Sequence, residues 1–288
     1  MKQVKKAIVP VAGYGSRFLP YTKAIPKAML PIINRPAIEV IIQEIVDSGI
    51  EEIYLIVGQN KDIIESHFSK NAKIENLLEE KGKYELLESI RRLSSLDINF
   101  VKQEVQDGTA RAIALCREQI GDEPFAILLG DDVMKNDVPV TKQLIDVYNT
   151  EKKTVIGVKQ VKTEDIPKYA TMKVERQRGK IYEISEIIEK PRIEQIKSNI
   201  APLGRYVCTP ELFEIIDTLK PGKNGEYQLT DALAALAEKG DAVAYEFDGE
   251  RYDMGDRFGF LKANIDFALS DKELHDKVDS YIKTLKNN

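Results

Sequence analysis

The stretch KAIVPVAGYGSR, from Lys6 to Arg17, joins a short apolar run to a glycine-rich loop. Its apolar, partly β-branched residues predict a buried strand over Lys6–Val11. We expect the loop that follows, with Ala12, Gly13 and Gly15, to bind an anion. Glycine has no Cβ that would keep a phosphate oxygen away from the backbone N–H groups. A tight turn without a ligand is an equally good interpretation of these residues taken alone.

The loop continues into a segment rich in proline and positive charge. Residues 17–31 contain three prolines and three cations, which are Arg17, Lys23 and Lys27. Prolines at this spacing exclude a regular helix. We therefore expect a rigid, extended backbone that holds the cations along a triphosphate.

Farther along the first half of the chain, apolar strands alternate with helical patterns. The expected strands are Lys6–Val11, Ile53–Val57 and Phe125–Leu129, and the expected helices are Ala37–Ser48, Lys61–Phe68 and Ala110–Glu118. This alternation predicts a three-layer α/β fold with a Rossmann-like, mixed but mainly parallel sheet. A charged, Leu-bearing stretch over Glu75–Leu96 is expected to form an exposed helical insertion.

The second half of the chain is richer in β-strand patterns. Strands are expected at Thr154–Val158, Met172–Glu175, Ile181–Ile188 and Ala242–Phe247, with a hairpin turn at Gly179. Helices are expected at Pro210–Leu219, Leu229–Glu238, Arg257–Leu269 and Lys272–Lys286. The simplest interpretation is a small β-rich extension of the sheet, followed by C-terminal helices.

Composition excludes several classes of protein. The chain has 288 residues, of which 43% are hydrophobic and 31% charged, so it is expected to fold as a globular protein. Its formal net charge of −5 argues against a nucleic-acid partner. No apolar run is long enough to cross a membrane, and cytoplasmic residence is the expectation. Cys116 and Cys208 are expected to be reduced structural thiols.

An acidic pair follows the apolar run that ends at Leu129. Asp131 comes directly after the expected buried strand, where open α/β sheets place their ligands. Its carboxylate is a suitable hard ligand for Mg²⁺. An Asp at a strand end also commonly caps the next helix, and Asp131 alone does not distinguish the two roles.

Several short motifs along the chain occur together in one known family. They are GYGSRFLP (13–20), TKAIPK (22–27), MLP (29–31), GDD (130–132), EKP (189–191), GRYV (204–207), GEYQLTDA (225–232) and YDMGD (252–256). With them, residues 5–270 resemble the bacterial uridylyltransferases of the sugar nucleotidyltransferase family. The resemblance implies one domain over 1–270 of the nucleotide-diphospho-sugar transferase type. Within it, a nucleotide-binding part covers about 1–135 and a sugar-binding part about 136–256. The helices of 257–288 would then be available for contact in a homo-oligomer, a dimer or a tetramer.

The resemblance also implies an activity, which is transfer of a uridylyl group from UTP to glucose 1-phosphate with release of pyrophosphate. A phosphate oxygen of the sugar phosphate would attack the α-phosphorus in line, with Mg²⁺ as cofactor and no covalent enzyme intermediate. The attacking oxygen is already anionic at neutral pH, so no general base is required. This agrees with a chain whose two histidines, His67 and His275, fall in expected surface helices.

Residue roles follow from the same resemblance. The cationic groups would be Arg17 for pyrophosphate, Lys27 for the nucleotide phosphates and Lys190 for the sugar phosphate. Ala12, Gly13, Gly15, Gln103 and Gly108 would bind the nucleotide, with Gln103 on the pyrimidine edge. Asp132, Glu189 and Gly204 would bind the sugar, and Asp131 and Asp253 the metal. The residues alone also allow a surface Gln103 and a simple ion pair between Glu189 and Lys190.

Three positions depart from the family pattern. Ala28 stands where a glutamate is usual, Arg111 lies in the base-reading segment, and Ala170 replaces a glycine near the sugar. These departures leave open dTTP or another hexose 1-phosphate as substrate, or a weakly catalytic regulatory homologue that binds nucleotide sugars. Because the charged residues of the site are all present in type, we predict an active enzyme.

Overall fold

The computed structural model describes residues 2–59, 61–222 and 225–286. Within them, the central element is a nine-stranded sheet with the order β5-β4-β1-β6-β11-β8-β12-β10-β9. These strands are β5 (Ile98–Lys102), β4 (Glu52–Val57), β1 (Lys6–Pro10), β6 (Phe125–Leu128), β11 (Ile200–Cys208), β8 (Thr154–Gln160), β12 (Ala242–Glu246), β10 (Ile181–Glu189) and β9 (Ala170–Arg178). Seven strands run in one direction, and β11 and β10 run against them. The predicted mixed, mainly parallel sheet is confirmed.

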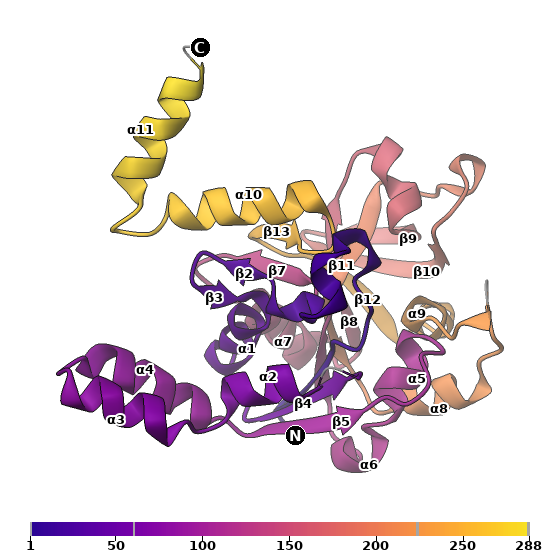
Figure 1. Cartoon of the computed structure of the whole chain (residues 1–288). Coiled ribbons are helices and arrows are strands. Elements are labelled where there is room, and N and C mark those ends of the chain that lie inside the picture. Colours follow the sequence, from indigo (N-terminus) through magenta and orange to yellow (C-terminus); the bar gives the residue numbers. More distant parts are fainter. Residues whose placement is uncertain (1, 60, 223–224, 287–288) are drawn as a thin grey trace.

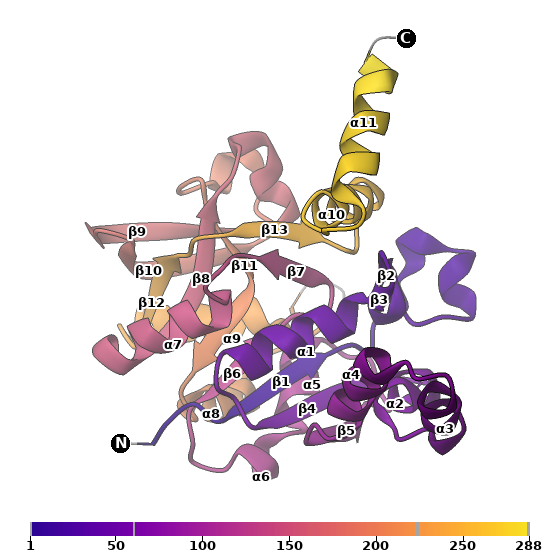
Figure 2. The ribbon, with the colours of Figure 1, turned by 90° about the vertical axis from the view of Figure 1, so that its left-hand side faces the viewer.

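Helices cover both faces of the sheet, as the predicted three layers require. On one face lie α1 (Ala37–Asp47), α2 (Lys61–Phe68) and α7 (Val140–Glu151), and on the other lie α5 (Thr109–Ala114), α8 (Glu211–Thr218) and α9 (Leu229–Glu238). Figure 2 shows α1 and α7 in front of the sheet and α8 and α9 behind it. Each face buries its own apolar core, because strands covered on both sides present hydrophobic side chains in both directions.

Two expected helices are each divided into two. The expected helix over 110–118 is α5 followed by the short α6 (Arg117–Ile120). The charged stretch over 75–96 forms two helices, α3 (Ala72–Glu80) and α4 (Tyr84–Ser94), which fold into a helical arm that projects from the body (Figure 1). The turn between them contains Gly82, which has a φ of 64°. A left-handed backbone of this kind ends a helix.

The segment after the glycine-rich loop differs from the expectation. Residues 17–31 were expected to be extended, and this prediction is wrong. The segment contains three short 3₁₀ turns, Ser16–Phe18, Tyr21–Lys23 and Lys27–Met29. Prolines separate these turns, so each can close its own i→i+3 hydrogen bond while none can grow into an α-helix.

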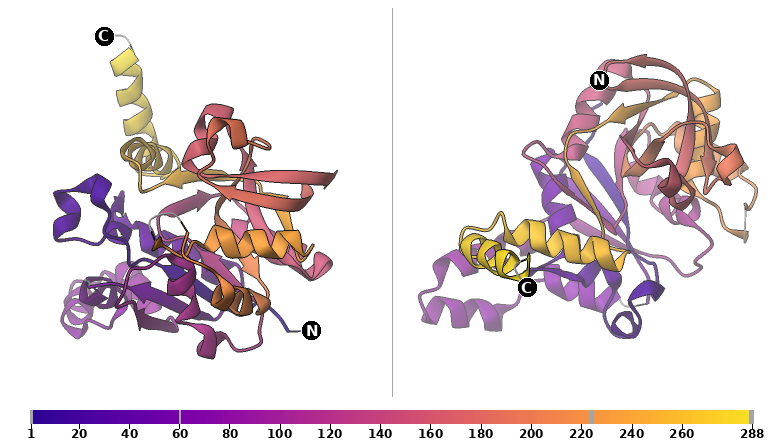
Figure 3. Two further views of the ribbon diagram at one scale, coloured as in Figure 1. Left: turned by 90° about the vertical axis from the view of Figure 1, so that its right-hand side faces the viewer. Right: turned by 90° about the horizontal axis from the view of Figure 1, so that it is seen from above.

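The remaining elements form the edges of the molecule. β9 and β10 make the predicted hairpin, with Gly179 at a φ of 61° in its turn. Two small antiparallel pairs, β2 (Pro31–Ile32) with β3 (Arg35–Pro36) and β7 (Asp132–Lys135) with β13 (Glu250–Asp253), lie outside the main sheet. The C-terminal helices are α10 (Arg257–Ala268), which packs on the body, and α11 (His275–Lys286), which stands away from it (Figure 3). Among the described residues, no helix has the length and apolarity that a membrane crossing demands.

The two thiols of the chain are expected to be inert in the native protein. Cys116 and Cys208 have no exposed surface, and burial raises the pKa of both thiols, that of Cys116 to about 12. The thiolate is the reactive form of cysteine, and we expect neither Cys116 nor Cys208 to form its thiolate at mildly alkaline pH. With Ellman's reagent, we expect no native thiol to react at the rate of free glutathione and both to react after unfolding in guanidinium. Fast modification of either native thiol would contradict the buried placement.

Candidate active site

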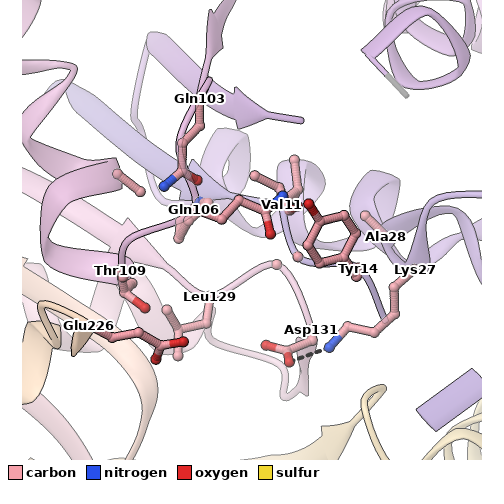
Figure 4. A pocket seen from close by; sticks show the side chains of 16 residues that line it. Val11, Tyr14, Lys27, Ala28, Gln103, Gln106, Thr109, Leu129, Asp131 and Glu226 are labelled. Carbon is pink, nitrogen blue, oxygen red and sulfur yellow. Dashed lines mark hydrogen bonds and ion pairs between the residues drawn. The ribbon is translucent and has the colours of Figure 1, made fainter. Parts of the chain in front are cut away.

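A cleft of about 480 Å³ opens where β1 and β6 end. In open α/β sheets this edge, at the carboxyl ends of parallel strands, is where ligands bind. Six of the predicted site residues line the cleft, and they are Ala12, Gly13, Lys27, Gln103, Gly108 and Asp131. Figure 4 shows Gln103 and Asp131 at opposite ends of the cleft, with Lys27 beside Asp131. Groups suited to a base and groups suited to phosphates therefore occupy different ends.

Three charged side chains meet around Gly255. Lys27 Nζ lies 2.5 Å from Asp131 Oδ2. A Cβ placed on Gly255 would lie 2.9 Å from Asp253 Oδ1, 3.0 Å from Lys27 Nζ and 3.3 Å from Asp131 Oδ2. The backbone N–H of Met254 donates to the carbonyl of Asp131 at 2.7 Å, which ties the two acidic segments together. A side chain at Gly255 would fill the space that the three charges share.

The two carboxylates fit a Mg²⁺ ion that shares its ligands with a substrate. Among the described residues, no group of three or more His, Cys, Asp or Glu side chains is arranged to hold a metal alone. Mg²⁺ is commonly held by one or two carboxylates together with substrate phosphates and water. Burial raises the pKa of Asp131, but the ammonium of Lys27, the guanidinium of Arg251 and a backbone hydrogen bond together leave this pKa below its ordinary value. Asp131 is therefore ionised, as a metal ligand must be.

Asp132, the neighbour of Asp131, faces the protein. It is 3% exposed and does not line the cleft, and its Oδ1 accepts a hydrogen bond of 2.6 Å from Arg251 Nε. Burial raises its pKa to about 6, and the repulsion from Asp131 adds to this while Arg251 opposes it. Gly204 lies directly against it, because a Cβ at Gly204 would come within 2.1 Å of Asp132 Oδ2. These two predicted sugar-side residues are thus in contact with each other.

Glu189 is the last residue of strand β10, and Lys190 follows it. Thr230 Oγ1 donates to Glu189 Oε2 at 2.9 Å, and Lys190 Nζ lies 3.5 Å from Glu189 Oε1, so the ion pair left open by the sequence is present. Lys190 has a φ of 41° although it is not glycine, and its backbone N–H donates to the Tyr169 carbonyl at 2.7 Å. Such strained conformations cluster at functional sites. The Lys190 side chain is 63% exposed and can reach an anion.

The far end of the cleft is built by the loop around Gly108. A Cβ at Gly108, whose φ is 120°, would lie 2.3 Å from the Tyr227 carbonyl oxygen, so only glycine lets these two segments touch. Sequence reasoning missed Gln106, whose Nε2 donates to the carbonyl of Ala12 at 2.8 Å and so joins this loop to the glycine-rich loop. Gln106 belongs to none of the family motifs, so no sequence signal pointed to it. Glu226, which also lines the cleft, belongs to the motif GEYQLTDA.

Arg17 lies in a second hollow of about 580 Å³. Arg251, Asp253 and Lys168 also line this hollow, and Arg17 donates to the Gly255 carbonyl at 3.4 Å. Gly255 therefore stands between the two hollows, with Lys27 and Asp131 on the side of the cleft and Arg17 and Asp253 on the other. Gly15 has a φ of 62° and precedes the 3₁₀ turn that carries Arg17. Arg251 is a second residue that no motif indicated.

The three departures from the family pattern occupy different surroundings. Ala28 lines the cleft and is 4% exposed. Ala170 is 1% exposed and is the strand partner of Glu189. Arg111 does not line the cleft, and its guanidinium lies 4.4 Å from the centre of the Tyr227 ring in a cation–π contact.

Residues 6–269 match the family model described as "Nucleotidyl transferase". The chain is 45% identical to the UTP–glucose-1-phosphate uridylyltransferase 2 of Staphylococcus saprophyticus over 289 residues, covering 100% of both proteins. It is 44% identical to the UTP–glucose-1-phosphate uridylyltransferase of Bacillus subtilis, covering 100% of this chain and 99% of that protein.

Solved structures agree with these relatives. The structure of a UDP-glucose pyrophosphorylase complexed with UDP-glucose superposes with a TM-score of 0.86 at 36% identity, covering 93% of this chain and 100% of the other. The UTP-bound UGPase of Acinetobacter baumannii gives a TM-score of 0.89 at 31% identity, covering 97% and 99%. By its match over nearly its full length and by its fold, this chain belongs to the nucleotidyl transferase family.

Proposed function

We propose that this protein transfers the uridylyl group of UTP to glucose 1-phosphate and forms UDP-glucose and pyrophosphate. The observation that carries the proposal is the meeting of Lys27, Asp131 and Asp253 around Gly255, at the phosphate end of a cleft whose other end carries Gln103. The names of its relatives, and the UTP and UDP-glucose bound in similar structures, support the same substrates.

The reaction is a single displacement at phosphorus. An oxygen of the sugar phosphate forms a bond to the α-phosphorus, and the bond from that phosphorus to the bridging oxygen breaks, so that its electron pair leaves with pyrophosphate. Two anions must approach each other, so cations that offset their charge are the main requirement. In our proposal Lys27 lies along the nucleotide phosphates, Lys190 holds the sugar phosphate, and Arg17 contacts the departing pyrophosphate.

The nucleophile carries its own negative charge, and no side chain has to remove a proton from it. The positions of the two histidines are consistent with a reaction that needs no general base. His67 Nε2 is engaged with Glu39 at 2.9 Å, and His275 begins α11, which stands away from the body. Asp131 and Asp253 would hold Mg²⁺, which when bound offsets the charge of the phosphates and orients them.

The other roles follow the division of the cleft. Ala12, Gly13 and Gly15 would bring backbone N–H groups to the triphosphate, and Gln103 and Gly108 would bind uracil. Glu189 would accept hydrogen bonds from sugar hydroxyls, and Gly204 with Asp132 would shape the sugar side. This assigns about residues 1–135 to the nucleotide and about 136–256 to the sugar, within one domain over 1–270.

The proposal is tested by pyrophosphate release from a matrix of nucleoside triphosphates and sugar 1-phosphates, with and without Mg²⁺. We expect turnover to require Mg²⁺ and to be fastest with UTP and glucose 1-phosphate. Preference for dTTP or for another hexose 1-phosphate would replace the substrate assignment. No turnover with any pair would leave the weakly catalytic regulatory homologue as the better interpretation.

We expect Asp131→Asn to lower kcat by about 100- to 1,000-fold, the usual loss when one group that stabilises transition-state charge is removed. The side chain keeps its size, so the variant should fold, with a melting temperature lowered only by the loss of the ion pair with Lys27. Asp137→Asn is the control, because Asp137 is exposed on the loop after β7. Near-normal Mg²⁺-dependent turnover in Asp131→Asn would remove Asp131 from the metal site.

Gln103→Leu tests the base end of the cleft. Loss of the amide leaves a buried edge of uracil without its partner, which typically costs about 1–3 kcal/mol, or roughly 5- to 150-fold in kcat/KM for UTP. The KM for glucose 1-phosphate should stay unchanged, because Gln103 lies at the other end from the phosphate-binding groups. Gln119→Leu, at an exposed position of α6, is the matched control. An unchanged kcat/KM for UTP would exclude Gln103 from base recognition.

We also propose that the C-terminal helices join copies of this chain in a dimer or a tetramer. Helix α11 exposes Tyr281 (64%) and Leu285 (57%) one helical turn apart, on a helix that stands away from the body. Exposed apolar side chains aligned on one helical face are typical of a protein contact.

Light scattering after gel filtration measures the oligomer directly. We expect the wild type to elute as a dimer or tetramer and Tyr281→Glu/Leu285→Glu to elute as a smaller species, since a buried charge opposes association. Lys283→Gln is the control, because Lys283 pairs with Asp279 on the opposite face of the helix. A double variant with the wild-type mass would exclude α11 from the contact.

A further inference from the structure

Arg205 is the largest side chain without exposed surface in the described part of the chain. It lies on β11, the reversed strand beside β6. Burying a guanidinium carries a large desolvation penalty unless its N–H groups find acceptors. The family motif GRYV contains Arg205, but none of the roles assigned above uses it.

Glu44 of α1 supplies the counter-charge. Arg205 Nε donates to Glu44 Oε1 and Oε2 at 3.0 and 3.1 Å, and Nη2 donates to Oε2 at 2.8 Å. Glu44 Oε1 also accepts from the backbone N–H and the hydroxyl of Thr141, at 3.0 and 2.7 Å. The first turn of α7 and helix α1 are thus fastened to one guanidinium.

The remaining N–H groups of Arg205 reach the backbone of the site. Nη2 donates to the carbonyl of Asp132 at 2.7 Å, and Nη1 donates to the carbonyl of Gly204 at 3.1 Å. The Gly204 carbonyl also accepts from the N–H of Leu129 at 2.9 Å. The guanidinium therefore bridges the turn that carries Asp131 and the strand segment on the sugar side.

A bulge in β11 aims Arg205 at this turn. The pairing of β11 with β8 shifts register between Pro202 and Tyr206, and Gly204 inside the shift has a φ of 70°. Bulges with a left-handed glycine redirect the next side chain and are common beside active sites. The bulge thus points Arg205 inward, toward Glu44.

From these contacts we infer that Arg205, held by Glu44, is a positioning residue for the metal-binding turn. It has no exposed surface and lines neither the cleft nor the second hollow. Met254 N–H holds the carbonyl of Asp131, and Arg205 holds the next carbonyl, that of Asp132, so two successive peptide groups are fixed and with them the direction of the Asp131 carboxylate. The inference rests on the proposed role of Asp131 as a Mg²⁺ ligand. Groups that orient a metal ligand typically matter about 10- to 100-fold for metal affinity or activity.

The test removes both charges together, in Glu44→Gln/Arg205→Met, so that neither is left buried alone. The substituted amide still offers an oxygen to Thr141. Both backbone carbonyls lose the donor that Arg205 supplied, and the Gly204 carbonyl keeps only the N–H of Leu129. The matched control is Glu75→Gln/Arg91→Met. Glu75 is 4% exposed and pairs with Arg91 at 3.1 Å in the helical arm, none of whose residues lines the cleft.

Calorimetry gives a readout that does not depend on turnover, namely the dissociation constant of UTP with EDTA and with Mg²⁺. The ratio of the two constants reports how well the protein holds the metal with the nucleotide. We expect this ratio to fall about tenfold in Glu44→Gln/Arg205→Met, with the EDTA value unchanged and kcat lower by about 10- to 100-fold. The control in the helical arm should keep the wild-type ratio and kcat.

Two results would overturn the inference in distinguishable ways. If wild-type UTP binding does not tighten with Mg²⁺, the metal role of Asp131 fails and the positioning role fails with it. If the wild type shows the tightening and a folded Glu44→Gln/Arg205→Met keeps it, only the positioning role fails. Should this double variant not fold, Arg205→Lys is measured in the same way. It keeps a charge for Glu44, but its three donors lie on one nitrogen and cannot span the carboxylate and both carbonyls as the planar guanidinium does, so the ratio should still fall.

Discussion

The guanidinium of Arg205 has no exposed surface and lies on a central strand of the sheet. The surrounding structure depends on giving each of its N–H donors an acceptor. The desolvation of Arg205 is offset only if each donor has an acceptor, and the acceptors come from α1, from β11 itself and from the turn after β6. Thr141 extends the same network into α7. Elements on one face of the sheet are therefore linked to the edge where the cleft opens, and none can shift without breaking a buried charged contact.

The reversed strand β11 brings a residue that we propose for the sugar next to the turn that we propose for the metal. Because β11 runs against β6 and β8, it brings Gly204 against Asp132, next to the acidic turn. The turn after β13 reaches the same place through the hydrogen bond between Met254 and Asp131. The proposed nucleotide side and the proposed sugar side therefore share one charged boundary around Gly255, where the cations of Lys27 and Arg251 offset the repulsion between the carboxylates.

Much of the first half of the fold could be predicted from the sequence, because buried parallel strands are continuous apolar runs, as in β1 and β6. Strand β11 gave no such pattern, since Pro202 and Gly204 interrupt it, and these residues flank or form the bulge that aims Arg205. The partnership of Arg205 with Glu44 joins positions far apart in the chain, and no local motif encodes it. The 3₁₀ turns of 16–29 were also missed, because proline spacing excludes an α-helix without distinguishing an extended chain from short turns.

Two of the departures from the family pattern, Arg111 and Ala28, have different surroundings and therefore different consequences. Arg111 is a permanent cation in the segment that we propose for base recognition, but its charge lies against the Tyr227 ring, outside the cleft lining. Its effect on the base is therefore indirect, through Tyr227, whose backbone touches Gly108. Ala28 does line the cleft, beside Lys27. The glutamate that is usual at position 28 in the family is absent here, and the Lys27 ammonium is paired with Asp131. Ala28 thus lies beside the lysine that we propose for the nucleotide phosphates, whereas the residues that we propose for the base, Gln103 and Gly108, line the other end of the cleft.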